Sequence, residues 1–129
     1  MASRVTATLR LKAGRTGILG PGKGRLLEEI DRAGSISAAA RGMGMSYKRA
    51  WDLVSDLNAL FKHPVVATSF GGAKGGGATL TQFGRDVLAR YRHMLEATDK
   101  ALSGDIAWLD KHLAADAAAG ANSEGGNER

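Results

Sequence analysis

Hydrophobic positions in this chain recur at steps of three and four over residues 34–61, the segment with the clearest amphipathic pattern. Residues 35–43 carry small and medium apolar side chains on one face, and two serines at their start can cap a helix. Residues 47–61 repeat the pattern behind a second capping residue, Ser46. Gly42 and Gly44 end the first run, because glycine tolerates the positive φ of a sharp helix exit. The segment therefore predicts two helices joined by a tight turn.

The second of these helices has an apolar face and a polar face on a helical wheel. The apolar face is predicted to hold Tyr47, Ala50, Trp51, Val54, Leu57 and Phe61. Its N-terminal turn exposes Ser46, Lys48 and Arg49, and the helix dipole and backbone N–H groups favour phosphate at such a turn. Side chains of the same turn can reach base edges in a DNA groove. The alternative is an ordinary amphipathic helix pair with a solvated charged face.

The region before this helix pair shows three further patterns. Apolar and polar residues alternate over residues 5–12, which predicts a half-buried strand. Residues 14–24 are rich in glycine and are predicted to form a loop, and residues 25–33 are predicted to form a third amphipathic helix. Gly17 to Lys23 matches the spacing of a phosphate-binding loop. The next position of such a loop is a serine or threonine whose hydroxyl binds magnesium, but here it is Gly24, so we interpret the glycines as a turn.

After the helix pair, β-prone residues 65–70 and 78–81 flank the glycine-rich segment GGAKGGG. They predict two short strands joined by a basic loop, the arrangement of a wing. Lys74 in that loop could reach a DNA phosphate or the minor groove. A simple flexible hairpin is the alternative.

Residues 82–102 are predicted to form a long helix capped by Thr81. Two adjacent columns of apolar residues repeat every seven positions along it, a pattern typical of a helix that pairs with another helix. The predicted dimer contacts are Val87, Leu88, Tyr91, Met94, Leu95, Thr98 and Leu102. The alternative is that the stripe packs only on its own domain. Ser103 to Asp105 is predicted to interrupt the helix, with a further short helix to residue 113 and a disordered tail over residues 114–129.

Composition narrows the function classes. The 129 residues carry a net charge of +5, and the part from Arg4 to Leu102 holds 16 basic and 8 acidic residues, an excess that suits a polyanion. There is no cysteine, no apolar run that could span a bilayer and no secretion signal, so we expect a soluble cytoplasmic protein. The three histidines are far apart in sequence, and no nucleophile has a suitable context. We expect neither a metal site, nor a cofactor, nor an enzyme.

Several motifs in this sequence resemble the N-terminal DNA-binding domain of the ModE family of molybdate-responsive transcriptional regulators, which is related to the winged helices of LysR-type regulators. The matching residues are Gly34-Ser35-Ile36-Ser37 with Ala39-Ala40, Ser46-Tyr47-Lys48-Arg49-Ala50-Trp51-Asp52 with Asn58, and Gly71 to Ala78 with Leu80-Thr81 and Gly84. The resemblance implies a dimeric winged-helix protein that binds DNA through the start of the recognition helix and through Lys74. It also implies that Trp51 and Asn58 fix the fold.

These patterns together predict a mostly α fold with a small β wing: a winged helix-turn-helix domain over residues 1–113, including a long C-terminal dimerisation helix. The residues predicted to contact DNA are Ser37, Arg41, Ser46, Tyr47, Lys48, Arg49 and Lys74. The expected function is sequence-specific binding of double-stranded DNA by a homodimeric transcriptional regulator. The alternative is a winged-helix module that binds a protein, or DNA without specificity. Family members continue into oxyanion-sensing domains for which this chain has no room, so we expect no molybdate binding and any effector signal to come from a separate protein.

Overall fold

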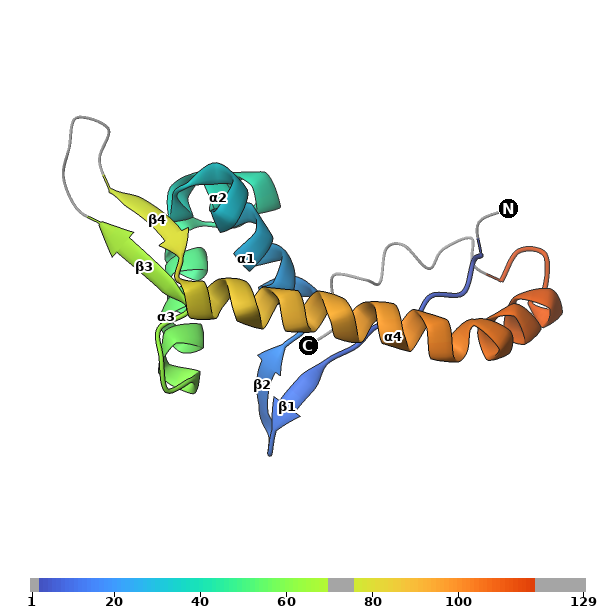
Figure 1. Cartoon of the computed structure of the whole chain (residues 1–129). Coiled ribbons are helices and arrows are strands. Elements are labelled where there is room, and N and C mark those ends of the chain that lie inside the picture. Colours follow the sequence, from blue (N-terminus) through green and yellow to red (C-terminus); the bar gives the residue numbers. More distant parts are fainter. Residues whose placement is uncertain (1–2, 70–75, 118–129) are drawn as a thin grey trace. The chain divides into compact units, whose positions relative to one another are not determined.

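The computed structural model describes residues 3–69 and 76–117. These residues form four helices and two small antiparallel sheets, so the described fold is mostly helical (Figure 1). The chain divides into two units, one of residues Thr8–Leu95 and one of Met1–Ala7 with Glu96–Arg129. The elements in chain order are β1 (Leu11–Ala13), β2 (Thr16–Leu19), α1 (Pro21–Ala33), α2 (Ile36–Met43), α3 (Tyr47–Leu60), β3 (Val66–Ser69), β4 (Gly77–Leu80) and α4 (Gln82–His112).

The segment before α1 differs from its prediction. Burial alternates over residues 5–12 as expected, but only Leu11–Ala13 forms a strand. This strand pairs with Thr16–Leu19, inside the segment predicted to be a loop, and α1 begins directly afterwards with Pro21 in its first turn. Proline suits this position because its fixed φ is helical and its missing N–H needs no partner. The Lys23 ammonium donates to the Gly17 carbonyl at 2.8 Å, so the resemblance to a phosphate-binding loop is confined to sequence spacing.

The two predicted helices and the turn between them are confirmed as α2 and α3. The Ser35 hydroxyl accepts a hydrogen bond from the Ala38 N–H at 3.0 Å, and the Ser46 hydroxyl accepts one from the Arg49 N–H at 3.1 Å. Each serine thereby satisfies one of the N–H groups that a helix start leaves unpaired. Gly44 ends α2 with a φ of 66°, in the left-handed region that glycine adopts without strain.

The β3–β4 hairpin is joined to the helices by side-chain and backbone hydrogen bonds. The Asn58 side chain accepts from the backbone N–H groups of Val65 and Val66, at 2.7 and 3.0 Å, and donates to the Val66 carbonyl at 3.1 Å. The Ala78 N–H donates to the Gly34 carbonyl at the end of α1 at 2.9 Å. The predicted role of Asn58 in fixing the fold is confirmed, because one side chain attaches α3 to the strand that opens the hairpin.

The core of residues 8–95 is apolar. Its buried side chains come from β2, from all four helices, from β4, and from Val65 and Val66 at the start of β3. Its largest fully buried side chains are Leu26, Leu27, Ile30, Val54, Leu57, Val65 and Leu80. Val87, Leu88 and Tyr91 of α4 belong to the same core. The Tyr91 hydroxyl donates to the Leu9 carbonyl at 3.0 Å, and burial raises the pKa of Tyr91 against the opposing effect of Arg10. The apolar stripe of α4 therefore serves, at its N-terminal end, to complete the core of its own chain.

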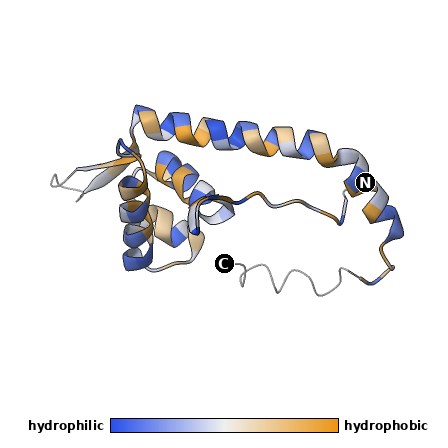
Figure 2. Cartoon of the chain, turned by 90° about the horizontal axis from the view of Figure 1, so that it is seen from below, coloured by the Kyte–Doolittle hydropathy of each residue, from blue (hydrophilic) through white to orange (hydrophobic). Residues whose placement is uncertain are grey.

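Helix α4 runs without interruption from Gln82 to His112, so the predicted break at residues 103–105 is wrong. An interior glycine costs a helix only about 1 kcal/mol, which the remaining turns offset. The predicted cap is confirmed, since the Thr81 hydroxyl accepts from the Gly84 N–H at 2.9 Å. Figure 2 shows apolar residues recurring along the whole helix. Near its C-terminus the Asp110 carboxylate accepts from the backbone N–H of Arg4 at 2.9 Å.

Candidate nucleic-acid interface

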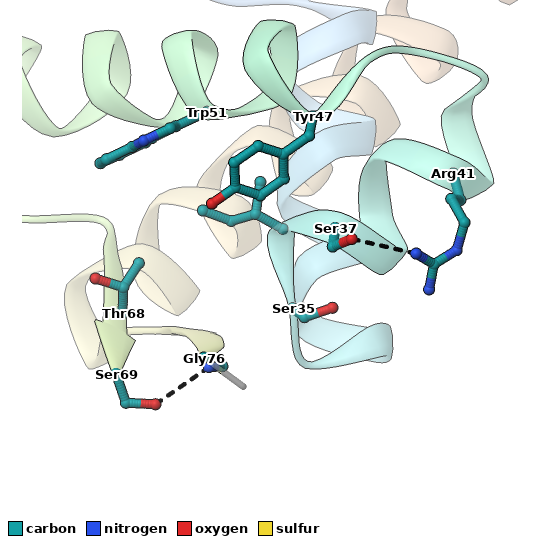
Figure 3. A pocket seen from close by; sticks show the side chains of 10 residues that line it. Ser35, Ser37, Arg41, Tyr47, Trp51, Thr68, Ser69 and Gly76 are labelled. Atoms are coloured by element: carbon teal, nitrogen blue, oxygen red, sulfur yellow. Dashed lines mark hydrogen bonds between the residues drawn. The ribbon is translucent and has the colours of Figure 1, made fainter. Parts of the chain in front are cut away.

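A hollow of about 540 Å³ lies where α2, α3 and the β3–β4 hairpin meet, all within residues 8–95. Figure 3 shows two aromatic rings from α3 on one side, strand β3 across the opening and the start of α2 at the end. The described residues that line it are Ser35, Ile36, Ser37, Arg41, Tyr47, Trp51, Thr68, Ser69, Gly76 and Gly77. The hollow thus joins the predicted recognition helix to the predicted wing.

The aromatic rings of Tyr47 and Trp51 lie in this hollow rather than in the core, which corrects the predicted apolar face of the helix and the predicted structural role of Trp51. Exposure of Tyr47 agrees with its prediction as a contact residue. The Tyr47 residue is 53% exposed and Trp51 is 44% exposed. The fully buried side of α3 consists of Ala50, Val54 and Leu57. On the helical wheel Tyr47 and Trp51 fall together at one edge of that stripe, one turn apart. The buried face of α3 is therefore narrower than predicted. Trp51 lies outside this face, so its exposure argues against a role in fixing the fold.

Helix α2 contributes a hydroxyl and a cation to the end of the hollow. The Arg41 guanidinium donates to the Ser37 hydroxyl at 3.1 Å, and both residues are exposed on the same side of α2 (Figure 3). Arginine offers several N–H donors in a fixed plane, so one bond to serine leaves others for a ligand. The structure therefore places Ser37 and Arg41 beside Tyr47, and all three are predicted DNA-contact residues.

The first turn of α3 presents the remaining predicted cations. The Lys48 ammonium pairs with the Asp52 carboxylate at 3.0 Å, and both side chains are largely exposed. Arg49 is also exposed, and its guanidinium has no hydrogen bond or ion pair with the residues that the structure describes. The Ser46 hydroxyl is occupied as a helix cap. An exposed pair such as Lys48 with Asp52 is worth only about 0.5 kcal/mol, so the ammonium can exchange this partner for a phosphate.

The remaining predicted residues are Lys74, in the predicted wing, and the dimer contacts on α4. Lys74 lies outside the described residues. The predicted dimer contacts differ in burial along α4. The first three, Val87, Leu88 and Tyr91, are buried in the core of their own chain. Met94, Leu95 and Thr98 are half-buried, and Leu102 is exposed. The large apolar residues that α4 exposes most lie farther along the helix, at Trp108 and Leu109.

Two kinds of site are absent from the part of the chain that the structure describes. Over residues 3–69 and 76–117, no three histidine or acidic side chains lie close enough together to hold a metal ion. Within the same ranges, no helix combines the length and apolar character needed to cross a membrane. His63 instead packs its ring edge-on against Phe83, with ring centroids 5.4 Å apart.

Residues of β3 complete the site, and the sequence prediction did not include them. Thr68 and Ser69 line the hollow from β3: Thr68 lies opposite Trp51, and the Ser69 hydroxyl accepts a hydrogen bond from the Gly77 N–H at 3.3 Å (Figure 3). Alternation along a strand puts only every second side chain on a given face, but both residues lie near the strand's end and line the opening. The signal available in the sequence was their position at the end of a β-prone run, shortly before the glycine-rich segment.

Comparison with known proteins identifies relatives over most of this chain, although no family model matches it. The DNA-binding transcriptional dual regulator ModE of Escherichia coli K12 is 36% identical over 101 residues, which are 78% of this chain and 38% of the relative. The molybdenum-pterin-binding protein MopA of Rhodobacter capsulatus is 43% identical over 96 residues, 74% of this chain and 36% of MopA. The homologues of this chain are ModE and Mop proteins.

A third relative is also much longer than the segment that matches this chain. The molybdenum transport protein ModE of Azotobacter vinelandii is 48% identical over 68 residues, 53% of this chain and 25% of the relative. The chain therefore spans only about a quarter to two fifths of the curated relatives that it matches. What these whole proteins do passes to this chain only as a proposal.

Proposed function

We propose that this chain is the DNA-binding part of a ModE-type transcriptional regulator, a winged helix-turn-helix that binds a specific duplex site as a homodimer. The observation that carries the proposal is the exposed first turn of α3, with Lys48 and Arg49, beside a hollow shared with α2 and the β3–β4 hairpin. A recognition helix enters the major groove with its N-terminal residues, while the preceding helix crosses the backbone. The relative in Escherichia coli is named a DNA-binding transcriptional regulator, which supports the same assignment.

The starts of α2 and α3 support this role, because a helix start carries backbone N–H groups that have no partner within the helix. Ser35 and Ser46 each satisfy one N–H of their helix. The other N–H groups of each first turn carry the positive end of the helix dipole, which favours phosphate oxygens. Cationic side chains at Arg41 and Arg49 extend the same potential over the surface. Phosphate contacts from this face would make affinity fall steeply with salt.

The dimer is a separate part of the proposal and rests on the later turns of α4. Because Val87, Leu88 and Tyr91 are buried in their own core, the pairing surface begins beyond them. Leu102, Trp108 and Leu109 are exposed apolar side chains on this part of the helix. Large exposed apolar residues at helical spacing are typical of a helix that packs against a second copy.

The contact between α3 and DNA is tested by removing its two cations. We expect Lys48→Ala with Arg49→Ala to lower affinity for a specific duplex about 10- to 100-fold, because each residue loses a phosphate or base-edge contact. The slope of log affinity against log salt should fall by about two. Fluorescence anisotropy titrations at several salt concentrations measure both quantities, and the circular dichroism spectrum should stay unchanged.

A matched control removes the same charge elsewhere in the same unit. Lys12 and Arg15 are exposed on the β1–β2 hairpin, which lies on the opposite side of α1 from α2 and the β3–β4 hairpin (Figure 1). Lys12→Ala with Arg15→Ala should change the affinity by less than about threefold, since these cations lie beyond close reach of the bound phosphates. Equal losses in the two double variants would show that net charge, rather than the first turn of α3, determines binding.

A further inference from the structure

The proposed DNA surface binds phosphate through cations and hydrogen-bond donors. Phosphate binding does not account for the two exposed aromatic rings, Tyr47 and Trp51, in the hollow. Trp51 is 44% exposed although tryptophan is usually well buried, and Tyr47 is exposed beside it. Ile36, which is 6% exposed, also lines the hollow. Exposed apolar area of this kind on an otherwise polar surface marks a contact site.

The lining of the hollow restricts what it can hold. Its described residues supply an apolar side made by Trp51, Tyr47 and Ile36, and hydroxyl groups from serine and threonine. Arg41 is the charged residue among these described lining residues, and none of them is acidic. An occupant must therefore offer an apolar group next to hydrogen-bond acceptors, without positive charge. The cationic surroundings at Lys48 and Arg49 favour an occupant that belongs to a polyanion.

Duplex DNA presents one such combination in its major groove. Thymine carries a C5-methyl group beside the O4 acceptor, whereas the other bases present only donors and acceptors there. Apolar side chains contact the thymine methyl, and hydroxyl or guanidinium donors can reach the adjacent oxygen.

We propose that the hollow is a thymine-reading site, in which the Trp51 ring contacts the C5-methyl group and Ser37 or Arg41 donates to O4. The inference rests on the proposed DNA binding and adds to it a residue, Trp51, that selects the base. Thr68 faces Trp51 across the opening, so the methyl would lie between α3 and β3 (Figure 3). Tyr47 forms the neighbouring part of the wall and orients the base edge.

The experiment replaces thymine by deoxyuridine, one symmetric pair of positions at a time, in a duplex that the wild-type protein prefers. This change removes only the methyl group. At one position the wild-type affinity should fall about 3- to 10-fold, since two half-sites each lose a buried methyl. In Trp51→Ala the same replacement should have no effect, while the affinities at all other positions should change as in the wild type. Trp51→Phe, which keeps an apolar ring, should retain part of the methyl sensitivity.

Ser55 provides the control, because it is exposed on α3 and does not line the hollow. In Ser55→Ala the ratio of affinities for the thymine and deoxyuridine duplexes should stay as in the wild type. If no deoxyuridine position lowers wild-type affinity, or if the critical position acts equally in wild type and Trp51→Ala, the thymine-reading inference is wrong while DNA binding stands. If the wild type does not prefer its selected duplex over a scrambled one, the proposed function itself fails.

Discussion

Gly84→Ala is expected to lower the free energy of unfolding by about 2 to 4 kcal/mol, because the added methyl group would clash with the backbone of Val65. A Cβ atom at residue 84 would lie 2.0 Å from the Val65 carbonyl oxygen and 3.0 Å from its carbon. That carbonyl cannot retreat freely, because it accepts the Thr81 N–H at 3.0 Å. The higher helix propensity of alanine offsets at most about 1 kcal/mol of this clash.

The same helix offers the control for this substitution. Gly104 also lies inside α4, but a Cβ built there meets nothing within 4 Å. Gly104→Ala should therefore stabilise the protein by about 0.5 to 1 kcal/mol. Urea unfolding followed by far-ultraviolet circular dichroism, at one protein concentration, measures both variants. Similar effects at the two positions would contradict the close approach of α4 to Val65, and destabilisation at Gly104 would contradict a continuous α4.

Asn58→Ala is expected to cost about 2 to 4 kcal/mol, because it leaves three backbone groups at the start of β3 without their partner. The Asn58 amide satisfies the N–H groups of Val65 and Val66 and the carbonyl of Val66. Both valines are almost completely buried, so water cannot replace the lost bonds. Losing this connection should also loosen the β3–β4 hairpin relative to α3, and DNA affinity should fall as a consequence.

Ser55→Ala controls for the substitution itself, since Ser55 is exposed on the same helix and its side chain has no described hydrogen bond. Its free energy of unfolding should stay within about 0.5 kcal/mol of the wild type. Hydrogen exchange of the Val65 and Val66 amides reports the local effect, and it should accelerate in Asn58→Ala beyond the change in global stability. Unchanged protection of these two amides would contradict the role assigned to Asn58.

Local signals in the sequence were sufficient for the helix pair and its hairpin. Ser35 and Ser46 were predicted caps, and Gly44 was a predicted turn residue. All three play these roles in the structure. Capping depends on a hydroxyl and on the next few N–H groups, so the pattern is contained within one turn of chain. The antiparallel pairing of β3 with β4 was predicted for a similar reason, because it depends on a short glycine-rich connection.

The features that the sequence did not reveal depend on contacts distant in the chain. Thr16 to Leu19 forms a strand although it contains Gly17 and is followed by Gly20, because Leu11 to Ala13 supplies the partner. Whether Trp51 belongs to the core or to the hollow depends on how α2 and β3 pack around α3, which a helical wheel does not contain. The same limit applies to α4, whose apolar stripe serves the core at Tyr91 and is exposed at Trp108.

Selection of bound sequences from a random pool of DNA duplexes tests the central claim most directly. The selected duplex and a scrambled control are then titrated with the protein at two salt concentrations. We predict a two-fold symmetric site that the protein prefers over the control by roughly 10³-fold or more at both salts. No common motif, with affinities for both duplexes that fall equally as salt rises, would contradict sequence-specific binding by this chain.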